Sequence, residues 1–340
     1  MTSADVTSIE PGAAASREAD RPVSEAEQLV TVVITTCDRP TVVARALRSA
    51  LAQTHEQIEI IVVDDGSTDR FDPSNVRETS QTDRDVRVIA TSGREGANRA
   101  RNLGLKAAGG SWITFLDDDD ELLPDMVARS LRRAATSTLP HPIAVVSSIR
   151  EYEDGVQTLT RVPRSRMLGG AYRIDAEDHE HPGMAAFNTL VLPTTIMRQI
   201  GGFDEDIRAA MHTDLLLRVN AVCSIQALSD VTYHMYHHSS YRLSTQALKR
   251  AEGMLHTWRK HRATFHRFPR REATHISNIG MYFLRGGCWR QAFSLCGRAL
   301  LSYPTAPRVT RNMLCALVGP RVYQALARYR ILSSRGQRHA

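Results

Sequence analysis

Short apolar runs alternate with segments of helical spacing through the first half of the chain. Five of these runs have the length and the β-branched composition of strands buried in a parallel sheet. They are residues 30–34, 58–63, 86–90, 112–116 and 143–147. Strands that are separated by helices and joined by short loops predict an α/β fold with a mainly parallel sheet covered on both faces.

The segments between the runs carry signals for helix starts and stops. Pro40 lies where a helix can begin with proline at its first position. Residues 96–108 have a helical pattern that Gly109 and Gly110 stop. A further helix is predicted after Pro124. Helices on both sides of the sheet would give a three-layer α/β/α sandwich.

Three of the predicted strands run into polar or acidic residues. The segments that come after them are residues 35–38, 64–67 and 117–120. Parallel strands bring such ends to one edge of the sheet, and ligands of open α/β sheets bind beyond that edge. We therefore expect an acidic ligand site there, able to hold a metal ion.

The strongest chemical signal is the run of four aspartates from Asp117 to Asp120. Adjacent carboxylates repel one another unless a cation neutralises them. Their hard oxygen atoms suit Mg²⁺ or Mn²⁺, which could bridge to a diphosphate. The competing interpretation is a solvated acidic turn that caps the helix near Pro124.

A second acidic segment, Asp64-Asp65-Gly66-Ser67, also has two interpretations. In one it is an ordinary turn in which glycine supplies the backbone conformation and aspartate caps the next segment. In the other, a carboxylate accepts a hydrogen bond from the N3–H group of uracil, which cytosine lacks. The presence of two acidic strand ends favours the functional interpretation.

Five segments together resemble the family 2 glycosyltransferases, which are inverting enzymes of the GT-A fold. They are residues 30–38 (VTVVITTCD), 60–69 (IIVVDDGSTD), 100–104 (ARNLG), 110–124 (GSWITFLDDDDELLP) and 201–218 (GGFDEDIRAAMHTDLLLR). The resemblance covers about residues 28–244 and implies a GT-A-type sandwich with a Rossmann-like sheet. It also implies a nucleotide diphosphate sugar as donor, usually a UDP-sugar, and a Mn²⁺ or Mg²⁺ cofactor.

Carried over by position, the resemblance assigns the donor and metal residues. Thr35, Cys37 and Asp38 would lie by the nucleotide, Asp65 would accept from the uracil ring, and Asp118 would contact the ribose. Asp119 would bind the metal, with Asp117 as the leading carboxylate and His238 completing the metal shell. For His238, an exposed histidine-rich turn is the alternative. The residues concerned are Thr35, Cys37, Asp38, Asp65, Asp117, Asp118, Asp119 and His238.

The sequence departs from the family pattern in three places. The mildest is Thr35, where proline is common in the family and threonine is also accepted. Cys37 stands where an aromatic residue often stacks on the base, which puts the identity of the base in doubt. Met211 and His212 stand where the family usually has a Glu-Asp pair whose aspartate is the catalytic base. A neutral histidine can take a proton near pH 7, since its unperturbed pKa is about 6.5. Our hypothesis is that His212 is the base; the alternatives are Asp214 and a site without activity.

The chain divides into three predicted parts. Residues 1–28 are small, polar and acidic, unlike a signal peptide, and we expect a disordered leader. Residues 29–244 would form the GT-A domain, with a nucleotide-sugar half (29–125) and an acceptor half (126–244). The acceptor itself is expected between residues 180 and 215. Residues 245–340 would form a basic helical extension, in which 273–304 resembles one tetratricopeptide-like helix pair expected to pack on the main domain.

Charge is distributed unevenly along the chain. The formal net charge is +6, yet residues 245–340 carry 18 basic and 2 acidic residues, and residues 1–244 carry 25 basic and 35 acidic ones. The basic extension predicts a surface for anionic lipid headgroups. The alternatives are a homodimer contact with the acidic front of a partner, or a solvated basic face. No recognition motif supports nucleic acid as a partner.

The five cysteines form no CxxC pair, and their odd number argues against a disulfide framework. No run reaches the ~18 apolar residues of a membrane helix. We therefore expect a cytoplasmic protein, peripheral at the inner face of the membrane. The predicted function is metal-dependent transfer of a sugar, with inversion, to a hydroxyl of a glycan, lipid-linked sugar, protein or small molecule. The alternative is a degenerate, non-catalytic nucleotide-sugar-binding or scaffold protein with a basic docking tail.

Overall fold

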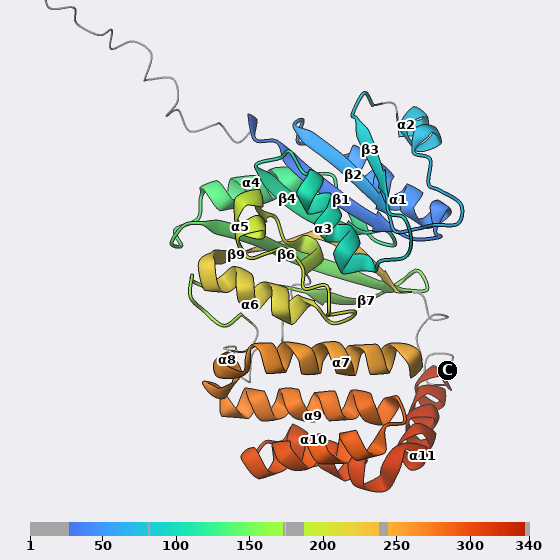
Figure 1. The fold of residues 1–340 in the computed structure, drawn as a ribbon, viewed down its shortest axis with the longest axis vertical. Helices are drawn as coiled ribbons and strands as arrows, with labels where there is room; N and C mark the ends of the chain where they lie inside the picture. The colour runs from blue at the N-terminus through green and yellow to red at the C-terminus, as the bar shows by residue number, and fades with distance from the viewer. Residues whose placement is uncertain (1–26, 81, 173, 175–186, 238–243, 337–340) are drawn as a thin grey trace, which may run out of the picture.

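A five-stranded sheet forms the centre of the molecule (Figure 1). The computed structural model describes residues 27–80, 82–172, 174, 187–237 and 244–336. The strand order is β3-β2-β1-β4-β8, and only β8 is antiparallel to its neighbour. The strands are β1 (Val30–Thr36), β2 (Ile58–Asp64), β3 (Val86–Ala90), β4 (Trp112–Asp117) and β8 (Leu192–Pro193). Four predicted strands are thereby confirmed, as is the mainly parallel sheet.

Alternate residues of these strands enter two separate cores, as the period of two in a strand requires. Val33 and Ile61 pack with helices α3, α5 and α6 on one face. Val32 and Ile60 pack with α1, α2 and α4 on the other. These helices are α1 (Pro40–Leu51), α2 (Ser74–Ser80), α3 (Ala97–Ala107), α4 (Met126–Ala135), α5 (Thr194–Gln199) and α6 (His212–Val222). The three-layer α/β/α prediction is confirmed.

The fifth predicted strand is present but lies in a second sheet of order β5-β9-β6-β7. Its strands are β5 (Glu121–Leu122), β6 (Ile143–Glu153), β7 (Val156–Arg161) and β9 (Ser224–His237). The free edge of β4 is taken by β8, so β6 pairs with β9 instead. Short β5 comes directly after the aspartate run, and the second sheet is therefore fastened to the acidic strand end.

The last part of the chain is helical, as predicted, and stacks below the sheets (Figure 1). It contains α7 (Ser244–Lys260), α8 (Arg262–His266), α9 (Pro269–Arg285), α10 (Trp289–Ser302) and α11 (Pro307–Gly336). The predicted helix pair is α9 and α10. We expected this pair to pack directly on the main domain, but α7 lies between the pair and that domain (Figure 1). We refer to residues 245–340 as the helical extension.

Helix α7 makes an unusually close approach to the loop that precedes α6. A Cβ atom added at Gly253 would lie 2.0 Å from the carbonyl oxygen of Ala209, so only glycine fits there. The core of the helical extension also includes Ala171, Ile174 and Leu217 from the preceding part of the chain. The extension and the segment before His212 are therefore packed as one body.

Candidate functional site

The polar strand ends meet at one edge of the sheet, as the sequence predicts. Thr36 of β1 lies opposite Asp64 of β2, and Thr35 lies opposite Asp117 of β4. Thr35 is 9% exposed, and Cys37, one residue beyond β1, is partly buried. A cysteine side chain is too small to stack on a base, so any base held here would need other contacts.

Hydrogen bonds tie the loop after β1 to the loop after β2. Asp38 has a left-handed backbone (φ 51°), and its carboxylate accepts from the backbone N–H of Thr68 at 2.7 Å. The backbone N–H of Asp38 in turn donates to Ser67 Oγ at 2.8 Å. Buried Asp64 accepts from the backbone N–H of Ser67 (2.9 Å) and of Phe71 (3.1 Å). The loops that would surround a nucleotide are thus fixed to one another.

Asp65 fixes the turn that opens helix α3. Its two carboxylate oxygens accept from the backbone N–H groups of Glu95 (2.8 Å) and Gly96 (2.9 Å). Gly66, at φ +69°, lies against this turn, and a Cβ there would be 2.4 Å from the carbonyl carbon of Gly93. Oδ1 also accepts from Thr91 Oγ1 at 3.4 Å, whereas Oδ2 accepts only from Gly96 among the described residues and keeps a second lone pair for a ligand.

The aspartate run alternates between partly exposed and buried carboxylates. Asp117 and Asp119 are 29% and 30% exposed, whereas Asp118 and Asp120 are buried. Asp118 accepts from Thr36 Oγ1 at 2.8 Å and forms an ion pair with Arg39. Burial and the charges of Asp119 and Asp117 outweigh Arg39 and raise the pKa of Asp118 to about 6.

Asp120 connects the run to the second sheet. It accepts from Tyr233 Oη at 2.8 Å and from the backbone N–H of Tyr236 at 2.9 Å. Burial, and then the charges of Asp117 and Asp119, raise its pKa well above the usual carboxyl value. Burial is therefore the main cause of the raised pKa values of Asp118 and Asp120, and the neighbouring carboxylates add to it.

Asp117 has two buried partners that the sequence analysis did not assign. Arg101 donates to it at 2.6 Å and Asn188 Nδ2 at 2.7 Å. Burial alone would raise the pKa of Asp117, but Arg101, Asn188 and the charge of His212 lower it. Arg101 lies within the ARNLG segment and could have been found there, whereas nothing in the local sequence marks Asn188.

The donor atoms at this edge fit a divalent cation. Among the described residues, Arg39 is the one side chain that contacts the Asp119 carboxylate, at 3.0 Å. Within the described ranges, no group of three or more His, Cys, Asp or Glu side chains is arranged as a metal site. Mg²⁺ and similar ions are commonly held by one or two carboxylates together with substrate phosphates, and Asp117 and Asp119 meet that need. His238, the third predicted ligand, lies outside the described residues.

His212 is the first residue of α6 and lies within electrostatic range of Asp117. Ala210, two residues earlier, has a left-handed backbone (φ 62°). Non-glycine residues in this region cost energy and cluster at functional sites. His212 is thus close enough to Asp117 to influence its pKa, and its role as the base stays a prediction.

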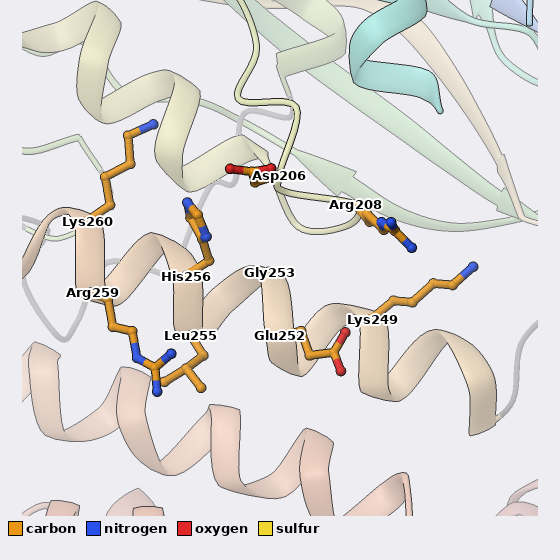
Figure 2. Close-up of a pocket in the computed structure, with 9 residues that line it drawn as sticks. All are labelled: Asp206, Arg208, Lys249, Glu252, Gly253, Leu255, His256, Arg259 and Lys260. Carbon is orange, nitrogen blue, oxygen red and sulfur yellow. The ribbon is translucent and has the colours of Figure 1, made fainter. Parts of the chain in front are cut away.

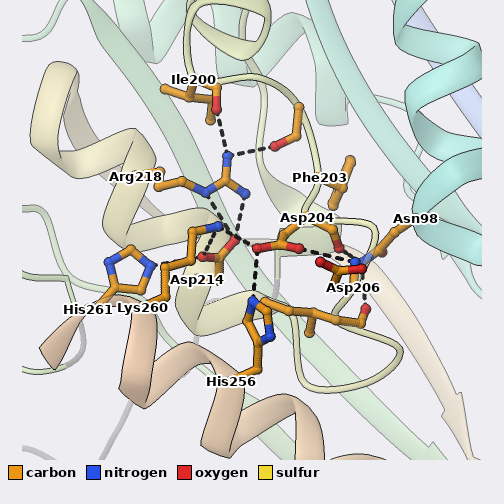
Figure 3. Close-up of polar contacts among 12 residues, drawn as sticks. Asn98, Ile200, Phe203, Asp204, Asp206, Asp214, Arg218, His256, Lys260 and His261 are labelled. Carbon is orange, nitrogen blue, oxygen red and sulfur yellow. Dashed lines mark hydrogen bonds and ion pairs between the residues drawn. The ribbon is translucent and has the colours of Figure 1, made fainter.

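Asp214 lies two residues further into α6 and is surrounded by basic side chains (Figure 3). It is 1% exposed and contacts Arg218 at 2.6 Å, Lys260 at 2.9 Å and His261 at 2.8 Å. Burial alone would raise the pKa of Asp214, but hydrogen bonds from His261 and Arg218 and the charge of Arg218 hold it well below the usual value. Two of the partners come from the end of α7 and the residue after it.

We expect Asp214→Asn to lower the free energy of unfolding by about 3 kcal/mol, because partly buried Arg218 and His261 lose the buried carboxylate that they contact. The folded-state pKa of Asp214 is depressed, so this stability is fully present above the ordinary aspartate pKa of about 3.9 and is lost as the pH falls through the folded pKa. Urea unfolding should show a gap between wild type and variant that shrinks from pH 5 downwards.

The matched control for this prediction is Asp230→Asn. Asp230 forms an ion pair with Arg129 at 2.6 Å, and the two side chains are 46% and 43% exposed. Exposed ion pairs contribute about 1 kcal/mol or less to the free energy of unfolding. An Asp214→Asn variant as stable as the Asp230→Asn variant would contradict a structural role for Asp214.

The fold and the acidic strand end define a GT-A-type protein. Residues 31–193 match the family model described as "Glycosyl transferase family 2". An uncharacterized glycosyltransferase of Bacillus subtilis, YwdF, is 30% identical over 194 residues, covering 56% of this chain and 67% of that protein. The chain therefore belongs to glycosyl transferase family 2.

Two further comparisons mark the extent of this similarity. The succinoglycan biosynthesis protein ExoO of Rhizobium meliloti is 41% identical over 105 residues, which are 31% of this chain and only 29% of that protein. A mannosyltransferase structure from Pyrobaculum calidifontis, in complex with GDP-Man and Mn²⁺, is similar at a TM-score of 0.53 and 18% identity, over 87% of this chain and 86% of that one. At that identity the likeness concerns the fold alone.

Proposed function

We propose that the chain transfers a sugar from a nucleotide diphosphate sugar to a hydroxyl acceptor, with inversion at the anomeric carbon. The observation that carries the proposal is the meeting of three polar and acidic strand ends beside His212, which lies within electrostatic range of Asp117. Membership of glycosyl transferase family 2 supports the same reaction class.

In this proposal the donor lies across the ends of β1, β2 and β4. Asp65 and Asp118 would accept from the base and the ribose, and Thr35, Cys37 and Asp38 would line the base. Asp65 and Asp118 are already held by backbone N–H groups and by Thr36, so they need no reordering when the donor binds. Because Cys37 offers no stacking face, both uracil and guanine donors have to be tested.

Asp119 and Asp117 would hold a Mn²⁺ or Mg²⁺ ion together with the donor diphosphate. A bound ion of this kind neutralises charge that develops on the departing diphosphate. The protein itself would hold the Asp117 carboxylate in place for the ion, through the hydrogen bonds that Arg101 and Asn188 donate to it.

His212 would act as the general base. The acceptor oxygen forms a bond to the anomeric carbon while the bond from that carbon to the diphosphate breaks, and the acceptor proton passes to the His212 imidazole. Asp214, the other candidate, is buried among Arg218, Lys260 and His261, and its lowered pKa makes it a poor proton acceptor. The acceptor would sit between residues 180 and 215, of which 180–186 lie outside the described residues.

A thermal-shift screen of UDP- and GDP-sugars with Mn²⁺ or Mg²⁺ tests donor, base and metal together, since a ligand stabilises only the state that it binds. Release of the nucleotide diphosphate without acceptor then tests for turnover. Binding without release, across several sugars and acceptors, would support the degenerate, non-catalytic protein instead. If no nucleotide sugar binds, both the transferase and the non-catalytic nucleotide-sugar-binding protein are excluded.

We also propose that the helical extension rests on an anionic membrane surface. Leu301 is 88% exposed on α10, and Leu314 and Leu317 are 59% and 54% exposed on α11. Exposed Arg290 and Arg308 belong to the same two helices. Apolar side chains among basic ones are typical of helices that lie on anionic lipid. In the described part of the chain, no helix combines the length and apolarity needed to span a bilayer.

We expect the protein to co-sediment with vesicles that contain anionic lipid and not with neutral vesicles. A Leu301→Ser/Leu317→Ser variant should bind about tenfold more weakly, because each side chain loses apolar area to bury. Leu159→Ser, at a 47% exposed leucine of β7, is the control and should bind like wild type. Equal binding by both variants would contradict this surface, and a concentration-dependent dimer by light scattering would favour the homodimer contact.

A further inference from the structure

A cavity of about 510 Å³ lies between helix α7 and the loop that precedes α6 (Figure 2). The loop contributes Asp206 and Arg208, and α7 contributes the remaining wall. The α7 residues of the cavity are Lys249, Glu252, Gly253, Leu255, His256, Arg259 and Lys260. Five of the nine lining residues are basic types and two are acidic, so the wall favours an anion.

The basic side chains of the cavity differ in whether an acidic partner contacts them. Lys260 and His256 are engaged, since both contact Asp204, at 2.5 Å and 3.3 Å. Arg208 and Lys249 are exposed, and neither forms an ion pair or hydrogen bond with any residue in the described ranges. Figure 2 shows these two side chains reaching the same end of the cavity. Two like charges at one end of a cavity repel each other unless an anion lies between them.

We propose that Arg208 and Lys249 form a subsite for a phosphate group carried by the acceptor. A guanidinium fork and an ammonium group are the side chains that bind phosphate oxygens. Two full positive charges match a phosphomonoester or a diphosphate, whereas a single carboxylate would leave one charge uncompensated. The proposal rests on the transferase function, because it takes the ligand of the cavity to be the sugar acceptor.

The position of the cavity connects it to the reacting groups. Arg208 is four residues before His212, so their Cα atoms are at most about 14 Å apart. An acceptor whose hydroxyl reaches His212 can therefore place a nearby phosphate at Arg208. The close packing of Gly253 on Ala209 fixes the wall of the cavity relative to this loop.

The phosphate could belong to a diphosphate that links a sugar to a lipid, or to a phosphorylated sugar. Titration calorimetry with inorganic pyrophosphate and with glucose 6-phosphate separates these sources, and glucose is the uncharged reference. EDTA in the buffer removes metal-dependent binding at the aspartate run, and the ionic strength is held constant.

We expect an Arg208→Gln/Lys249→Gln variant to bind the better of the two anions at least tenfold more weakly than wild type. Glu252 lines the same cavity one turn after Lys249, so Glu252→Gln should tighten binding about two- to threefold by removing a repulsive charge. Arg48→Gln is the control, since Arg48 is exposed on α1, away from the cavity, without a side-chain partner among the described residues, and should change nothing.

Equal affinity in wild type and double variant, or the absence of anion binding to wild type, would overturn the subsite. The proposed function fails on a different result, namely that wild type releases no nucleotide diphosphate from any donor. In that case the anion titration still decides whether the cavity binds phosphate.

Discussion

Replacing His212 with alanine is expected to lower kcat by about 10²–10⁴-fold, the usual contribution of a general base. The donor should still bind, because the residues proposed to contact it lie on the loops after β1, β2 and β4. His212 is only partly buried at the start of α6, so the variant should fold normally. Single-turnover transfer and a donor titration on the same preparation would separate the chemical step from binding.

His266→Ala is the matched control for this prediction. His266 is 50% exposed in the helical extension, where it contacts Glu272, and its loss should leave turnover near the wild-type value. Asp214→Asn completes the set, since we expect a loss of stability and only an indirect effect on rate. Full turnover by the His212→Ala variant would eliminate His212 as the base, and an inactive but stable Asp214→Asn variant would point to Asp214.

Asp119→Ala is expected to reduce release of the nucleotide diphosphate by about 10²–10³-fold, comparable to the loss of a group that stabilises developing charge in a transition state. The Mn²⁺-dependent part of the donor-induced thermal shift should disappear with it. Arg39 would keep its ion pair with Asp118, so the strand end should stay folded.

Asp85→Ala is the control for the metal prediction, because Asp85 is exposed just before β3, at the opposite edge of the sheet. It should leave both the metal-dependent shift and the release rate unchanged. If Asp119→Ala releases the nucleotide diphosphate at the wild-type rate and still requires Mn²⁺, the metal is not bound by Asp119.

The main sheet was predictable because β1, β2 and β4 are buried on both faces and form continuous apolar runs in the sequence. The meeting of Asp64 and Asp117 at one edge was predictable from the shared direction of β2 and β4. The edge position of Asp118 was predictable for the same reason. Its raised pKa was not, since it depends on burial that only the folded chain defines.

The second sheet was not predictable in the same way. Strand β9 mixes buried and exposed residues, and its pairing with β6 shifts register near Ser147 and Ser148, which breaks the alternation that would reveal a strand. Asn188 was missed because its partners, Asp117 and Tyr233, lie 71 and 45 residues away in sequence. Long-range polar contacts of this kind leave no periodic signal.

The partners of Asp214 illustrate a further limit. Lys260 and His261 lie in a segment whose sequence shows only an excess of basic residues. Its arginines and lysines suggested a surface role, and nothing local indicated that two of these residues reach the helix that carries His212. In the folded chain both residues contact the buried carboxylate of Asp214.

The contact of α7 with the loop before His212 has a consequence for exchanging segments between relatives. The family model ends at residue 193, which invites the view that the chain beyond that residue can be replaced freely. A chimaera that took its last helices from another protein would need glycine at position 253 to pass Ala209, and at positions 260 and 261 the ion-pair and hydrogen-bond partners of Asp214. Grafts that ignore these three positions should disturb helix α6, so the segment that must be kept together in a chimaera extends at least to His261.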